Sequence, residues 1–176
     1  MKMLFSGGSK SGKSCLAETA ATELAGDKSC FYIATMLPRD DEDLSRIQAH
    51  IKRREGKGFI TIECGRNIER VLDTVDKNST VLVDSVTALY TNEMFPEENG
   101  FAQDADAERR CTEGLLNIAR SVKNAVFVTD YVFSDAFRYD DVTEAYRKSL
   151  ANICRALAKE CDSVTEAVFS MGIRIK

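Results

Sequence analysis

Residues 7–14 constrain the fold of this chain more than any other segment. They read Gly-Gly-Ser-Lys-Ser-Gly-Lys-Ser, and a glycine followed after four residues by Gly-Lys-Ser satisfies the Walker A pattern of a phosphate-binding loop. That loop needs a strand before it and a helix after it. The apolar residues 2–6 and the alanine-rich residues 13–25 provide both. The segment therefore predicts a nucleotide-binding protein rather than an ordinary glycine turn.

Each residue type in this loop has a chemical task. Glycines let backbone N–H groups turn toward an anion, and the N-terminus of the following helix adds a partial positive charge. We expect Lys13 to neutralise the outer phosphates and to act in catalysis, while the Ser14 hydroxyl binds Mg²⁺. The predicted nucleotide-binding residues of the loop are Gly7, Gly8, Ser9, Lys10, Ser11, Gly12, Lys13 and Ser14.

An acidic residue at the end of a second apolar strand is expected to complete the site. Residues 80–84 read Thr-Val-Leu-Val-Asp, which makes Asp84 the favoured second residue for Mg²⁺, directly or through water. Residues 125–130 end in Asp130 after a similar run, so the sequence leaves that alternative open. Either aspartate is also suited to an N-cap. The predicted metal-binding residues are Ser14 and Asp84.

The rest of the chain alternates between apolar runs and stretches of helical periodicity, which predicts an α/β fold of the P-loop NTPase type. The sheet is expected to be mainly parallel and flanked by helices, in a single domain over residues 1–176. Residues 168–175 predict an edge strand or hairpin at the C-terminus. The predicted strands are 2–6, 30–35, 59–62, 80–83, 125–129 and 164–169, and the predicted helices are 13–25, 42–54, 66–76, 104–121 and 140–160.

Composition excludes several classes of function. Twenty-four basic and twenty-eight acidic side chains give a net charge of -4, so no global field favours nucleic acid or an anionic membrane. Six scattered cysteines without a CxxC pair predict reduced thiols in a cytoplasmic protein. No apolar run approaches the length of a membrane span, so membrane insertion is not expected.

The single histidine, His50, lies within the predicted helix 42–54. An imidazole among cations can act as a nucleophile toward a phosphate. The alternative is a solvated basic helix face, preceded by an acidic run at 40–43 that suits a helix N-terminus without any function. The cationic side chains near the histidine are Arg46, Lys52, Arg53, Arg54 and Lys57.

Several segments together resemble the bifunctional adenosylcobinamide kinase/adenosylcobinamide-phosphate guanylyltransferases of cobalamin biosynthesis. The loop at 7–14 is similar to the opening of that family. The discriminating block runs from Tyr-Ile-Ala-Thr at 32–35 to Arg-Ile-Gln-Ala-His at 46–50. Glu63 ends a further strand similar to one of the family, and residues 83–92 and 170–176 are also similar. The resemblance is most specific over residues 1–92.

The resemblance implies two reactions. ATP or GTP phosphorylates adenosylcobinamide, and GMP passes from GTP through a guanylylated His50 to adenosylcobinamide phosphate, giving adenosylcobinamide-GDP. It also implies corrinoid and nucleotide substrates, Mg²⁺ as cofactor, and a homo-oligomer, expected to be a trimer. Further nucleotide-binding residues are expected at Arg46, Arg54, Glu63 and Asp84.

The chain departs from the family pattern in its second half. Residues 130–136 lack the usual Asn-Glu-Val-Gly segment and its following proline, and Tyr146-Arg147-Lys148, Ala151 and Cys154-Arg155 replace other family features. Two alternatives therefore remain open. The first is a P-loop small-molecule kinase without guanylyl transfer, and the second is a non-catalytic, nucleotide-responsive binding protein.

Overall fold

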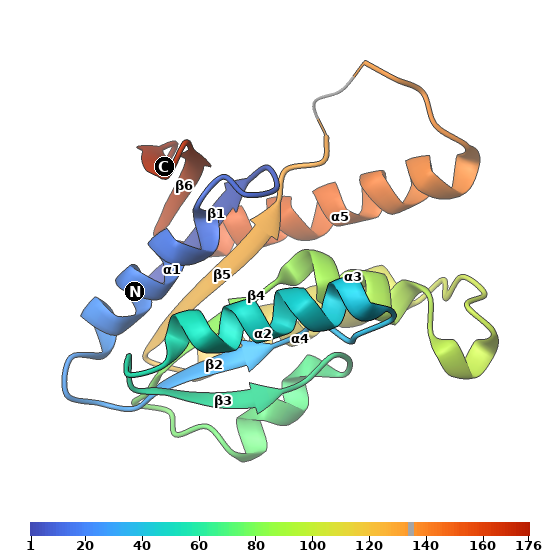
Figure 1. Ribbon diagram of the computed structural model, residues 1–176. Helices are drawn as coiled ribbons and strands as arrows, with labels where there is room; N and C mark the ends of the chain where they lie inside the picture. The colour runs from blue at the N-terminus through green and yellow to red at the C-terminus, as the bar shows by residue number, and fades with distance from the viewer. Residues whose placement is uncertain (134–135) are drawn as a thin grey trace.

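The computed structural model describes residues 1–133 and 136–176 (Figure 1). Residues 134 and 135, part of the segment that departs from the family, lie outside this description. The strands are β1 (Lys2–Gly7), β2 (Cys30–Ala34), β3 (Phe59–Glu63), β4 (Thr80–Asp84), β5 (Asn124–Asp130), β6 (Ser163–Val168) and β7 (Met171–Arg174). The helices are α1 (Lys13–Ala25), α2 (Asp41–Arg54), α3 (Val86–Met94), α4 (Ala107–Ser121) and α5 (Asp141–Glu160), with 3-10 helices η1 (Ile68–Asp73) and η2 (Glu97–Asn99).

The strands form one sheet in the order β3-β2-β4-β5-β1-β6-β7. All neighbours are parallel except β6 and β7, which form an antiparallel hairpin at the edge. The predicted six strands, the parallel sheet and the C-terminal hairpin are confirmed. Parallel strands place their carboxyl ends at one edge, and a ligand of an α/β sheet binds outside that edge.

The two faces of the sheet carry different helices because side chains alternate along each strand. Phe5, Tyr32, Leu82 and Val126 pack with Ala17 and other residues of α1 on one face. The opposite face packs against α3, α4, α5 and η1, and its strand residues are Leu4, Ile33, Val83 and Phe127. In Figure 1 α2 lies in front of the sheet, and Arg54 at its end packs on Tyr32, on the face that α1 also covers. None of the described helices combines the length and apolar character needed to cross a bilayer.

The helix predicted at 66–76 is wrong in type and extent. The structure has a 3-10 helix over Ile68–Asp73, preceded by Asn67 in the left-handed region, and buries Ile68 and Val71 against the sheet. A 3-10 turn needs few residues, so its periodicity is poorly distinguished from that of an α-helix.

The sequence prediction also missed α3. This helix starts after Ser85, whose side chain accepts a hydrogen bond from the N–H of Ala88. Its nine residues are buried on several sides, including Asn92 and Glu93, so they lack the polar face that marks an amphipathic helix. The predicted helix at 104–121 begins three residues later, at Ala107.

Candidate active site

The phosphate loop joins β1 to α1 at the carboxyl edge of the sheet. Gly7 ends β1, Gly12 adopts φ 91°, and α1 begins at Lys13. A Cβ atom on Gly12 would lie 2.8 Å from the Cα of Ser170, and one on Gly7 would lie 2.8 Å from the carbonyl oxygen of Ala167. Glycine is therefore required at both positions because the β6–β7 hairpin approaches closely. At position 12 the positive φ angle requires it as well.

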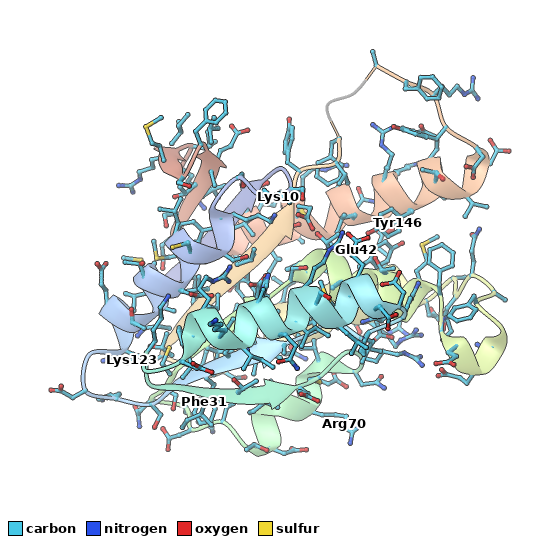
Figure 2. All side chains as sticks on the ribbon, viewed as in Figure 1. Lys10, Phe31, Glu42, Arg70, Lys123 and Tyr146 are labelled. Carbon is cyan, nitrogen blue, oxygen red and sulfur yellow. The ribbon has the colours of Figure 1, made fainter. Side chains whose placement is uncertain are left out.

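The middle of the loop faces solvent. Gly8, Ser9 and Lys10 are exposed, whereas Ser11 to Ser14 are half-buried. Figure 2 shows Lys10 on this loop, far from Arg70 in η1. The Ser170 N–H donates to the carbonyl oxygen of Ser11 at 2.8 Å, so the β6–β7 hairpin is hydrogen-bonded to the phosphate loop and supports it. The open side is where phosphate oxygens would meet the loop.

Lys13 is held inside the loop by two oxygen atoms. Its Nζ lies 2.6 Å from Asp130 Oδ1 and donates to the carbonyl oxygen of Gly8 at 3.2 Å. The register of β1 and β5 sets Gly7 opposite Asp130, and the Thr87 hydroxyl accepts the Asp130 N–H. The second acidic candidate, Asp130, is therefore fixed beside Lys13, the lysine that the sequence predicts to bind phosphate.

Asp84 belongs to a different cluster, which includes the histidine. Its side chain is 7% exposed, and its Oδ2 accepts a hydrogen bond of 2.8 Å from the Tyr32 hydroxyl. His50 Nδ1 lies 3.8 Å from the same Asp84 oxygen and 3.5 Å from the Tyr32 hydroxyl. Residues from β2, α2 and β4 therefore meet at one carboxylate, and the structure brings together His50 and Asp84, which the sequence had singled out separately.

Arg54 covers this cluster from the end of α2. Its guanidinium carbon lies 3.5 Å from the centre of the Tyr32 ring, and the residue is buried. An arginine over an aromatic face is stabilised by the ring quadrupole. Its positive charge is therefore held close to Tyr32, Asp84 and His50.

Burial sets the protonation of this cluster. Desolvation lowers the pKa of His50, the Asp84 carboxylate opposes that change, and Arg53 and Arg54 reinforce it. Burial raises the pKa of Tyr32, so its hydroxyl stays protonated and donates to Asp84. A neutral imidazole is the form that can act as a nucleophile.

Within the described part of the chain no hydrogen bond or ion pair joins Arg46 or Glu63 to this cluster. Arg46 is exposed and pairs with Glu42 and Asp43 one turn before it on α2. Glu63 ends β3 and lines two cavities of about 480 and 520 Å³. The second cavity also reaches Ile51 and Arg54 at the end of α2, which places Glu63 on the same hollow as the histidine helix.

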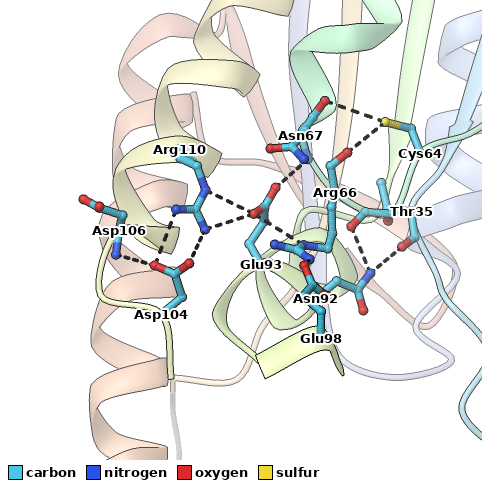
Figure 3. A network of polar contacts seen from close by, with 11 residues as sticks. Thr35, Cys64, Arg66, Asn67, Asn92, Glu93, Glu98, Asp104, Asp106 and Arg110 are labelled. Atoms are coloured by element: carbon cyan, nitrogen blue, oxygen red, sulfur yellow. Dashed lines mark hydrogen bonds and ion pairs between the residues drawn. The ribbon is translucent and has the colours of Figure 1, made fainter. Parts of the chain in front are cut away.

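A separate polar network braces the loops that follow β2 and β3 (Figure 3). The Asn92 amide donates to the carbonyl oxygens of Thr35 at 2.8 Å and Gly65 at 3.1 Å. Glu93, 1% exposed, accepts two hydrogen bonds from Arg110 and lies 3.8 Å from Arg66 Nε. Its charge is matched within the network, so we assign it to structure.

The donor set suits Mg²⁺ better than a metal held by protein alone. Mg²⁺ in nucleotide sites takes one or two protein oxygens and completes its shell with water and phosphates. In the described part of the chain no three His, Cys, Asp or Glu side chains are grouped to hold a metal. The Ser14 hydroxyl and the Asp84 carboxylate are the residues that would supply hard oxygen donors at the carboxyl edge of the sheet, with Asp130 as a further carboxylate.

Sequence reasoning missed the roles of two residues in this arrangement. Tyr32 enters the sequence prediction only as part of the family-like block, although its hydroxyl contacts both Asp84 and His50. Ser170 enters it only as part of a similar ending, although it backs the phosphate loop. The sequence did carry a signal for Tyr32, because a tyrosine among apolar strand residues needs a partner for its hydroxyl.

Known proteins are similar to this chain in sequence and in fold. The chain is 28% identical over 186 residues to the bifunctional adenosylcobalamin biosynthesis protein CobU of Escherichia coli (strain K12), with all of both chains covered. In fold it is similar to a solved ATPase domain (TM-score 0.51, 11% identity, 94% of this chain and 68% of that chain). It is also similar to the PH0250 protein of Pyrococcus horikoshii OT3 (TM-score 0.52, 11% identity, 99% and 85%).

The P-loop NTPase-like fold predicted from the sequence is thus confirmed. Residues 3–176 match the family described as cobinamide kinase / cobinamide phosphate guanyltransferase. That match spans the segments at 130–136 and 146–155 where the sequence departs from the family pattern. The chain belongs to the cobinamide kinase / cobinamide phosphate guanyltransferase family of enzymes.

Proposed function

We propose that this chain performs both reactions of its family through the two clusters described above. It phosphorylates adenosylcobinamide with ATP or GTP, and it transfers GMP from GTP to adenosylcobinamide phosphate through His50. The observation that carries the proposal is that the sole histidine lies on α2 with Nδ1 3.8 Å from Asp84, at the edge of the sheet that holds the phosphate loop.

The contacts of His50 favour one tautomer for this chemistry. A proton on Nδ1 faces the Asp84 carboxylate, which leaves the lone pair on Nε2 available. Nε2 attacks the α-phosphorus of GTP, the bond from that phosphorus to its β-bridging oxygen breaks, and pyrophosphate leaves. A phosphate oxygen of adenosylcobinamide phosphate then attacks the same phosphorus, and the bond to Nε2 breaks.

The surrounding charges support this assignment. Arg54 is buried over Tyr32, so its positive charge adjoins the histidine and can stabilise negative charge on the transferring phosphorus. Glu63 lines the cavity that also includes Arg54 and is a further nucleotide-binding residue in this proposal. Arg46 needs to leave Glu42 to reach a phosphate.

The kinase step uses the phosphate loop. Lys13 would contact the outer phosphates, the loop residues Gly7 to Ser14 would donate N–H groups, and Ser14 with Asp84 would hold Mg²⁺. When bound, Mg²⁺ neutralises charge on the phosphates. Positioning of the corrinoid hydroxyl against the terminal phosphate then supplies most of the remaining acceleration.

Product analysis separates the two reactions. Purified protein is incubated with adenosylcobinamide, Mg²⁺ and ATP or GTP, and the corrinoids are separated by mass. We expect Lys13→Ala to abolish both products, whereas His50→Ala should still make adenosylcobinamide phosphate but no adenosylcobinamide-GDP. If the wild type makes adenosylcobinamide phosphate but no adenosylcobinamide-GDP, the kinase-only alternative is favoured. If it binds nucleotide but makes neither product, a binding protein is favoured.

We also propose a homotrimer, as expected from the family. The edge strand β7 supports self-association of some kind, because Met171 and Ile173 on it are exposed, as are Phe169 and Ile175 beside it. Sedimentation equilibrium measures the mass directly. A monomer at working concentration would contradict this part of the proposal.

A further inference from the structure

A wholly buried carboxylate lies between the phosphate-loop helix and the histidine helix. Glu18 on α1 is 0% exposed. Its Oε1 accepts hydrogen bonds from Arg53 Nε at 3.0 Å and Nη2 at 2.5 Å, and its Oε2 accepts one from Lys57 Nζ at 2.9 Å. Both carboxylate oxygens are therefore used by cations from α2 and the turn that follows it.

Glu18 links helix α1, which begins at Lys13, to helix α2, which carries His50. It lies on α1 five residues after Lys13. Arg53 lies three residues after His50, and residues three apart in a helix are neighbours on its surface. The Glu18–Arg53 pair thus ties the helix that begins with the phosphate-binding lysine to the turn of α2 that carries the histidine.

Apolar packing contributes little to the placement of α2. Arg54 is its only buried residue, and Leu44 and Ile51 are both more than two-fifths exposed. The helix is therefore held mainly through polar contacts at its last turn. These are Arg54 on the Tyr32 ring and Arg53, with Lys57 beyond the helix, on Glu18.

We propose that Glu18 is a positioning residue for guanylyl transfer, fixing α2 so that His50 can reach the α-phosphorus of a nucleotide held by the loop. The inference rests on the function proposed above. Small displacements of a reacting group can cost a large factor in rate. The side-chain partners of Glu18 are Arg53 and Lys57 rather than the histidine or the phosphate loop, so it acts through these two cations.

The test uses Glu18→Gln, which keeps the shape and one acceptor oxygen but removes the charge. We expect the first-order rate of GMP attachment at saturating GTP to fall at least about tenfold, with the GTP concentration for half-maximal rate unchanged within about twofold. Since His50 is the sole histidine, its reaction with diethyl pyrocarbonate provides a second readout. A looser α2 should make that reaction faster.

Glu93→Gln is the matched control. Glu93 is equally buried and is also bound by guanidinium groups, but it lies in the separate network of Figure 3. We expect it to lower the unfolding temperature by an amount similar to Glu18→Gln while leaving both His50 readouts at wild-type values. Slower GMP attachment together with faster acylation therefore identifies positioning rather than general loss of stability.

Arg53→Gln provides a second test in case Glu18→Gln folds poorly, and the two changes together complete a double-mutant cycle. If Glu18 acts through Arg53, the double variant should be no slower than the slower single variant. The positioning role of Glu18 would be overturned by GMP attachment at the wild-type rate in Glu18→Gln, or by rate losses that add up in the double variant. Neither outcome would contradict the proposed function. Absence of any GMP adduct on the wild type would contradict the proposed function, and the acylation rates would still report whether Glu18 anchors α2.

Discussion

Lys13 and Asp130 form an ion pair of 2.6 Å inside the phosphate loop. The lysine side chain is 11% exposed and the aspartate 32%. The Tyr131 N–H donates to the carbonyl oxygen of Gly7, which fixes the end of β5 beside the loop. A nucleotide phosphate therefore has to compete with the Asp130 carboxylate for the ammonium group of Lys13.

Removing that carboxylate should strengthen nucleotide binding in the absence of Mg²⁺. We expect Asp130→Asn to tighten binding of ATP and GTP about two- to fivefold, the range of a partly exposed ion pair. Titration with a fluorescent nucleotide measures the dissociation constant. Asp27→Asn, at an exposed residue just beyond the C-terminal end of α1, controls for the change in net charge. Weaker binding of Asp130→Asn only when Mg²⁺ is present would make Asp130 the metal residue in place of Asp84.

Gly12→Ala should disable the phosphate loop. The residue has φ 91°, and the new Cβ would lie 2.8 Å from the Ser170 Cα. We expect a loss of about 2–3 kcal/mol in the free energy of unfolding and no measurable nucleotide binding. Gly100→Ala is the control, since Gly100 also has positive φ but open space around it, so that its cost should be about 1 kcal/mol. Equal losses in the two variants would show that the contact with Ser170 is unimportant.

Guanylylation should persist at mildly acidic pH. Burial lowers the pKa of His50 from its ordinary value of 6.5, so the folded protein keeps a neutral imidazole where an exposed histidine is already protonated. The rate at low GTP concentration, which reports the free enzyme, should fall only below pH 6.5. Because the unfolded chain binds that proton more readily, stability should also decline as pH drops below 6.5. An NMR titration of the sole imidazole giving a pKa of 6.5 or higher would contradict this.

Tyr32→Phe should affect the histidine more than the fold. The variant keeps the ring beneath Arg54 but loses the hydroxyl that donates to Asp84 and lies 3.5 Å from His50 Nδ1. We expect GMP attachment to slow about threefold to tenfold and stability to fall by about 1–2 kcal/mol. Single-turnover kinetics and chemical denaturation measure the two effects. An unchanged rate would exclude the hydroxyl from orienting His50.

Much of the fold was predictable because the constraints are local. The loop at 7–14 requires a strand and a helix around it, and the apolar runs of β4 and β5 are too short for helices and end in aspartates. The 3-10 helix η1 and the buried α3 were not predictable in the same way, since neither shows one apolar and one polar face.

The site was only partly predictable because its pairings depend on strand order. Asp84 and Asp130 follow equivalent apolar strands, and only the sheet order, with β5 between β1 and β4, sets Asp130 beside Lys13 and Asp84 beside His50. Glu18 and Arg53 are 35 residues apart, so no periodicity within α1 or α2 points to their contact. Such relationships arise from tertiary packing.

The central claim, that His50 carries GMP, is tested most directly by intact-protein mass spectrometry. The wild type and His50→Ala are incubated with GTP and Mg²⁺, desalted and weighed, with nucleotide binding checked separately for both. The account predicts a mass increase equal to one GMP moiety on the wild type, released by adenosylcobinamide phosphate and absent from His50→Ala. An unmodified wild-type mass with GTP binding intact, or the same adduct on His50→Ala, would contradict it.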